Sequence, residues 1–150
     1  MKQFLCMLAL VALMTSAAEG QERGFGLGVI LGEPTGVSTK GWISSQTAFD
    51  AGFAWSFRRT GFLHVHMDYL WHFSDIVNTN QRVNPYVGIG GRLAAREGSA
   101  IAGVRVPFGI VWLPANSPID VFLEIAPVVD LTPETEINAN GGIGVRFFFR

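Results

Sequence analysis

The sequence has little charge, almost no lysine and, after its first residues, no cysteine. Charged residues make up 15% of the 150-residue chain, below the roughly 25% common in soluble domains. The one cysteine is Cys6, and lysine occurs only at Lys2 and Lys40. A disulfide framework and a lysine-rich aqueous surface are therefore excluded for the rest of the chain. A net charge of −1 is also no electrostatic footprint for nucleic acid.

A short apolar run opens the chain and predicts export. Residues 4–14 are almost all apolar, too short a run to cross about 30 Å of hydrocarbon as a helix. Lys2 precedes the run, and small residues suited to cleavage follow at 16–18. We expect residues 1–18 to be a cleaved signal peptide and residues 19–150 to form one domain. No later run reaches the roughly 18 apolar residues of a transmembrane helix, so a closed β-barrel is the remaining way across a membrane.

Apolar and polar side chains alternate along the chain, most clearly over residues 63–73. Odd positions there are all apolar or aromatic, whereas even positions are mostly polar. This period of two gives a strand one apolar and one polar face, while a helix would scatter both. Seven other segments share the period: 25–31, 37–43, 49–57, 87–93, 104–112, 121–125 and 143–149. Turn-forming residues separate them, including a predicted loop over 130–138. The pattern predicts an all-β fold, an eight-stranded antiparallel up-and-down transmembrane β-barrel.

The composition of the polar face predicts that this face points inward. It is dominated by glycine, alanine, histidine and isolated charges, and small residues make room for a few long side chains inside a narrow barrel. Its charged residues come from different strands: Asp50, Asp68, Arg92, Arg105, Glu124 and Arg146. An unpaired buried charge costs several kcal/mol. We therefore predict that these residues pair in an interior charge network.

Three histidines share the same predicted face. His64 and His66 are two residues apart, so their side chains point the same way, about 7 Å apart. With Asp68 and His72, and with a further ligand from a neighbouring strand, they have the residue types of a zinc or copper site. The alternative, which we favour, is a hydrogen-bonded interior lining with no metal and no cofactor.

Two resemblances point to the bacterial outer membrane. The segment 141–149 ends in alternating Phe147 and Phe149 and resembles the C-terminal signature that the barrel-assembly machinery reads, although Arg150 follows it. Segments 31–36, 68–73, 88–92 and 122–133 resemble a family of small, functionally uncharacterised outer-membrane β-barrels of spirochaetes and other bacteria. Its architecture is similar to that of OmpA and OmpX. The resemblance implies the fold, outer-membrane lipids as the surroundings, and no assigned reaction.

The expected function is a structural or surface-interaction role, with a closed polar core, no open pore, no enzymatic activity, and loops as the contact surface for an extracellular ligand. Two alternatives stay open. A lipid-modifying enzyme of the acyltransferase or deacylase type would need a nucleophile, a base and a carboxylate; Ser38, Ser56 and the His64/His66/Asp68 stripe supply those types. A soluble lipocalin-like carrier of an apolar ligand would instead turn its apolar face inward.

Overall fold

The computed structural model describes residues 24–55, 63–74, 76–77, 81–96 and 98–149. These residues form strands and no helix. The strands are β1 (Phe25–Glu33), β2 (Thr35–Trp42), β3 (Thr47–Trp55), β4 (Leu63–His72), β5 (Arg82–Arg96), β6 (Ser99–Arg105), β7 (Phe108–Leu113), β8 (Ile119–Thr132) and β9 (Glu136–Phe149). Within the described ranges, no helix has the length and apolarity needed to cross a membrane.

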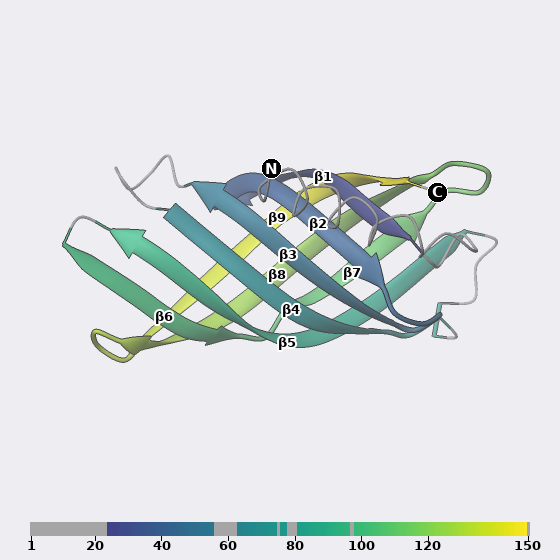
Figure 1. Ribbon diagram of the computed structural model, residues 1–150. Helices are drawn as coiled ribbons and strands as arrows, with labels where there is room; N and C mark the ends of the chain where they lie inside the picture. Colours follow the sequence, from purple (N-terminus) through teal and green to yellow (C-terminus); the bar gives the residue numbers. More distant parts are fainter. Residues whose placement is uncertain (1–23, 56–62, 75, 78–80, 97, 150) are drawn as a thin grey trace, which may run out of the picture.

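The strands close into a ring. Each pairs antiparallel with its neighbours, and β9 returns to β1 in register from Phe25↔Phe149 to Glu33↔Gly141. Figure 1 shows the strands inclined to the long axis of the resulting barrel. Phe25 and Phe149 lie at one end, here called the termini end. The opposite end, where β1, β3, β5 and β8 end, is called the hairpin end.

The predicted strand 104–112 is two strands, so the predicted count of eight is one short for the described residues. β6 pairs with one half of β5 and β8, and β7 pairs with the other half of both, so the two occupy one position of the ring. Pro107, which has no N–H to donate, lies at the break. The wall stays closed there because Val106 N donates to Pro127 O (3.0 Å) and Gly88 N donates to Pro107 O (2.8 Å).

The predicted loop 130–138 is mostly strand. β8 continues to Thr132 and β9 begins at Glu136, with Asp130 directly opposite Glu136. The prediction was wrong because polar residues suggested a loop, whereas in a barrel with a polar interior they occupy the inward positions of a strand. This β8–β9 hairpin extends past β1, since β9 pairs with β1 only from Gly141 onward. In Figure 1 it protrudes at the hairpin end, as the β5–β6 hairpin also does.

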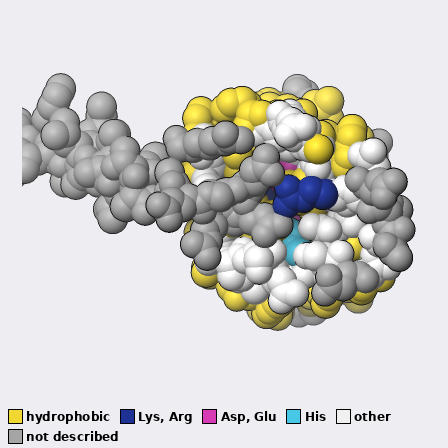
Figure 2. Space-filling model, turned by 90° about the vertical axis from the view of Figure 1, so that its right-hand side faces the viewer, with side chains coloured by type: hydrophobic (Ala, Val, Ile, Leu, Met, Phe, Trp, Pro, Cys, Tyr) yellow, Lys and Arg dark blue, Asp and Glu magenta, His cyan; other side chains and the backbone are white. Residues whose placement is uncertain are grey.

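The apolar face points outward, as predicted. Along β4 the outward Val65 and Met67 are 42% and 62% exposed, while the inward His64 and Asp68 are 0% and 1% exposed. The end view in Figure 2 shows hydrophobic side chains around the circumference, with basic, acidic and histidine side chains at the centre. The described part of the barrel thus has its charged side chains mostly inside, together with a smaller apolar cluster around Leu70 and Phe122, and most of its large apolar side chains outside.

Candidate functional site: the ionic interior of the barrel

The middle of the interior is organised around Arg105 of β6. Its Nε lies 2.9 Å from Asp68 Oδ2 of β4, and its Nη2 donates to Glu124 Oε1 of β8 at 2.5 Å. Tyr86 OH donates to the other oxygen of Glu124 at 2.8 Å. Arg105 is 2% exposed, so these partners balance a charge that is almost fully removed from solvent. Arg105 therefore links β4 and β8, which lie on opposite sides of β6 in the ring.

A second ion pair lies towards the hairpin end. Arg92 of β5 donates through Nε to Asp130 Oδ1 of β8 at 2.8 Å, and its Nη2 donates to the other carboxylate oxygen. Asn138 Nδ2 also donates to Asp130 Oδ2 at 2.8 Å. Two parallel bonds of this kind fix both the position and the orientation of a guanidinium group. The pair joins β5 to β8 across β6, in the region where the hairpins protrude.

A third pair holds the half of the barrel nearer the termini end. Arg146 Nε of β9 donates to Asp120 Oδ1 at 2.9 Å, and Arg146 Nη1 lies 3.8 Å from Asp50 Oδ2. The guanidinium carbon also lies 4.0 Å from the centre of the Phe122 ring, a cation–π contact. Arg146 Nη1 donates to Ser38 Oγ at 3.4 Å. The contacts of Arg146 thus reach β2, β3 and β8.

Lys40 and His72 form a separate cluster at the termini end. Lys40 is fully buried, and its Nζ donates to His72 Nε2 at 2.8 Å. His72 Nδ1 donates in turn to the carbonyl oxygen of Gln46 at 3.2 Å, so the ring is held as the neutral tautomer with its proton on Nδ1. The Trp42 ring contacts the His72 ring in a tilted arrangement, with centroids 4.4 Å apart, and faces the Lys40 ammonium at 4.2 Å. Lys40 Nζ also lies 3.8 Å from Asp120 Oδ2, which connects this cluster to Arg146.

The structure places all six predicted network residues inside the barrel and buries them. The sequence analysis missed three further charged members, Lys40, Asp120 and Asp130. Asp120 and Asp130 have the same parity as Glu124, so the alternation would have identified both if the predicted strand 121–125 had been extended in both directions, to residues 120 and 130. Lys40 lies in the weakest of the predicted strands and was not recognised as an interior group.

The predicted histidine stripe is divided in two. His64 and His66 lie together, with ring centroids 5.3 Å apart in an edge-to-face arrangement. His72 is six residues farther along β4, roughly 20 Å away, and belongs to the Lys40 cluster. The neighbouring strand β3 places Asp50 directly opposite Asp68. Ligand atoms of Asp50, His66 and Asp68 all lie within 4.8 Å of one another.

Glycines on the inward face provide the space for these side chains. A Cβ atom at Gly52 would lie 2.3 Å from His66 Cε1, and one at Gly90 would lie 2.0 Å from Asp68 Oδ1. Both distances are far below van der Waals contact, so His66 and Asp68 keep these positions only while their cross-strand neighbours lack a side chain.

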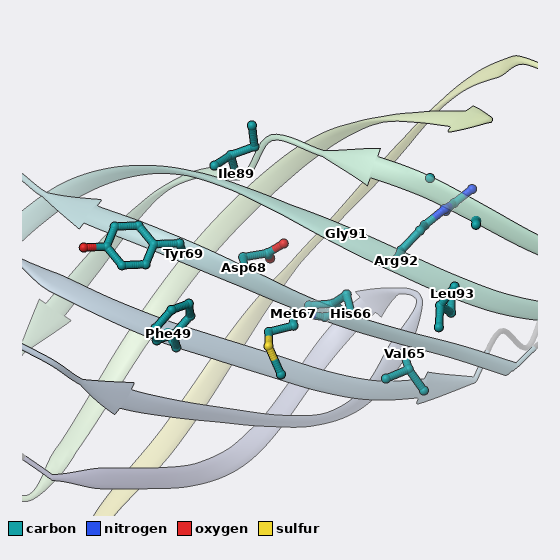
Figure 3. A pocket seen from close by; sticks show the side chains of 12 residues that line it. Phe49, Val65, His66, Met67, Asp68, Tyr69, Ile89, Gly91, Arg92 and Leu93 are labelled. Atoms are coloured by element: carbon teal, nitrogen blue, oxygen red, sulfur yellow. The ribbon is translucent and has the colours of Figure 1, made fainter.

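The outer wall carries a depression of about 580 Å³ beside Gly91 of β5. Apolar side chains surround it, among them Val65, Met67 and Leu93, as Figure 3 shows. Gly91 leaves it open because a Cβ there would meet nothing closer than Gly103 O at 3.7 Å. The depression opens on the apolar exterior, and its lining also includes His66 and Asp68, inward positions of β4 drawn in the same view.

The remaining predicted residues lie elsewhere. Phe147 and Phe149 are outward positions at the end of β9, 48% and 53% exposed, with ring centroids 5.3 Å apart. The hydroxyl of Ser38 accepts a hydrogen bond from Arg146, and Ser56 lies outside the described residues. Residues 1–18, predicted to be a signal peptide, also lie outside them.

Together the fold and the site define a closed antiparallel β-barrel with a buried ionic interior and an apolar exterior. Comparisons with models of protein families, with curated proteins and with solved structures find no match to this chain.

Proposed function

We propose that this chain is a small integral barrel of the bacterial outer membrane, with a structural or surface-interaction role and no open pore. The observation that carries the proposal is the apolar exterior. All nine strands contribute to it, and 29 large hydrophobic side chains in the described part of the chain are at least 37% exposed. Soluble monomers rarely expose an apolar patch above a few hundred Å². Acyl chains of lipids are the surroundings in which such a surface is stable.

The aromatic residues of the exterior support the same proposal. Trp55 faces outward near the hairpin end, while Trp71 and Trp112 face outward near the termini end. Tryptophan favours the interface between lipid tails and water, and outer-membrane barrels carry an aromatic girdle at each interface. Trp42 and Tyr86 are not part of such a girdle, because both point into the barrel.

A filled interior supports the absence of a pore. Arg105, Arg146 and Lys40 are each at most 2% exposed, and their partners come from strands around the ring. Ion pairs that cross the interior occupy the space a channel would need, and an eight-position barrel leaves little of it. The role we infer for the interior is mechanical, since pairing between strands on different sides of the ring makes the cylinder rigid.

The orientation of the barrel decides which connections could contact an extracellular ligand. Both chain ends of such barrels conventionally face the periplasm, so the connections at the hairpin end are extracellular. The connections that follow Glu33 and Thr132 are short, whereas seven residues separate Trp55 of β3 from Leu63 of β4. The connections 43–46 and 114–118 lie at the termini end. We therefore propose the structural role first, with any extracellular ligand contacting the hairpin end.

The two alternatives have less support. A lipocalin-like carrier needs an apolar interior for its ligand, and the interior here is ionic. A lipid-modifying enzyme needs a nucleophile beside a base, whereas the Ser38 hydroxyl contacts Arg146. Neither arrangement matches the contacts that the described residues make.

Envelope fractionation tests the proposal. The full chain, expressed in a Gram-negative host, is expected in the outer-membrane fraction, and a variant lacking residues 1–18 is expected to stay in the cytoplasm. The extracted protein should migrate differently on a denaturing gel with and without boiling, and should give no conductance steps in a planar bilayer. Recovery of the full chain in the periplasm without detergent would overturn the proposal in favour of a soluble carrier.

A further inference from the structure

Asp50, His66 and Asp68 form a group with the geometry of a metal site. Asp50 on β3 is directly opposite Asp68 on β4, and His66 precedes Asp68 by two residues on the same inward face. One ligand atom from each lies within 4.8 Å of the other two. Figure 3 shows His66 and Asp68 along β4 with Met67 between them.

The polar atoms of this group lack hydrogen-bond partners. Asp50 Oδ1, both carboxylate oxygens of Asp68 and His66 Nδ1 are buried and make no hydrogen bond within the described part of the chain. Arg105 Nε lies 2.9 Å from Asp68 Oδ2, but the geometry is that of an ion pair without a hydrogen bond. Asp50 and Asp68 are 5% and 1% exposed, respectively. Buried polar groups are normally paired, so the other three atoms, Asp50 Oδ1, Asp68 Oδ1 and His66 Nδ1, indicate a missing partner.

The charge balance of the interior favours a cation as that partner. The buried charged residues that the structure describes are Lys40, Asp50, Asp68, Arg92, Arg105, Asp120, Glu124, Asp130 and Arg146. They comprise five carboxylates and four basic groups, so one carboxylate is in excess. Asp50 has the weakest pairing, because its ion pair with Arg146 is a 3.8 Å contact. The excess negative charge therefore lies nearest Asp50 and Asp68.

We propose that Asp50, His66 and Asp68 bind a divalent transition-metal ion inside the barrel, with Zn²⁺ as the representative. Two carboxylates and one imidazole are ligands that zinc accepts at about 2.0–2.2 Å, with a fourth position for water. The three side chains would rotate towards a common centre to reach these distances. Calcium and magnesium prefer oxygen ligands alone, so the imidazole favours a transition metal.

Neighbouring residues suit this role. Arg105 beside Asp68 Oδ2 leaves Oδ1 for the ion and orients the carboxylate, as outer-shell partners of metal ligands do. His66 is less buried than either aspartate and retains accessible surface, whereas Gly52 and Gly90 keep the space beside the ligands free.

Zinc binding to the purified, detergent-solubilised full chain tests the proposal. The protein is stripped with a chelator and titrated with Zn²⁺ by calorimetry, and the bound metal is counted after dialysis. We expect one zinc per chain. His66→Gln and Asp50→Asn should each weaken binding by about tenfold or more, since loss of even an outer-shell partner costs about 10–100-fold.

His72→Gln is the matched control. It changes an inward histidine of the same strand, outside the group, and should bind zinc as the unchanged protein does. Heat-dependent gel mobility verifies that each variant is folded, and Co²⁺ absorption of the unchanged protein reports coordination independently of any variant. Absence of zinc retention, or equal weakening by His72→Gln and His66→Gln, would overturn the proposal. These results do not depend on where the protein resides, so they are separate from the fractionation result.

Discussion

Arg105 gives the sharpest test of the interior network, because its removal leaves two buried carboxylates without their cation. Arg105→Met replaces a 2% exposed guanidinium by an apolar side chain that adapts to irregular space. Asp68 and Glu124, 1% and 5% exposed, then lose contacts of 2.9 and 2.5 Å. Breaking a buried ion pair on one side costs about 3–5 kcal/mol. We expect a loss of that size in the free energy of unfolding.

Urea unfolding of the protein in detergent or lipid vesicles measures this loss, with tryptophan fluorescence and gel mobility as readouts. The control is Arg96→Met, which removes an exposed arginine from the end of the neighbouring strand β5 and should change stability by less than about 0.5 kcal/mol.

A triple variant, Asp68→Asn, Arg105→Met and Glu124→Gln, should recover most of the loss because it leaves no buried charge at these positions. The amide oxygen of the glutamine at position 124 can still accept a hydrogen bond from the Tyr86 hydroxyl. If Arg105→Met is no more destabilising than Arg96→Met, the interior pairs do not hold the barrel together.

The other predictions concern the two faces of the wall. Gly52→Ala should cost about 1–3 kcal/mol of unfolding free energy, the usual cost of overpacking, because the new Cβ would lie 2.3 Å from His66 Cε1. Gly41→Ala, where a Cβ meets nothing within 4 Å, should show no such loss in the same denaturant titration. Met67→Arg places a charge on the middle of the outward face of β4 and should destabilise the barrel in lipid vesicles by about 2–4 kcal/mol, as at the midplane of a membrane barrel. Equal stability of Met67→Arg and the unchanged protein in vesicles would contradict the proposal that this face contacts lipid.

The alternation of residue types was sufficient to predict the class of fold and the direction of each face. Val65, Met67 and their neighbours alternate with His64 and Asp68, and neither periodicity nor composition fits a helix. The polarity of the interior could be inferred because the inward face holds glycine and isolated charges instead of the lysine and threonine of a solvated sheet.

The limits of the prediction have physical causes. Pro107 interrupts the hydrogen bonding of one strand without interrupting its alternation, so the division into β6 and β7 was not visible. Asp130 and Asn138 have the polarity of a loop, but in this barrel the same polarity marks an inward position. The pairing of particular charges depends on the inclination and register of the strands. Hence the contact between Asp50 and Asp68, and the separation of His72 from His66, became clear only from the structure.

At the hairpin end, one side of the barrel wall extends farther along the barrel axis than the other. β9 runs through residues 136–140 before it meets β1, a length of roughly 16 Å at about 3.3 Å per residue. With the inclination of about 40° usual in membrane barrels, this sector rises roughly 12 Å above the β1–β2 turn. In a bilayer, one side of the cylinder would then end near the headgroups while the other stands clear of them. Ile137, 81% exposed, lies on the extended side. A molecule that approaches the barrel would therefore meet the β1–β2 turn near the membrane surface on one side and the protruding β5–β6 and β8–β9 hairpins on the other.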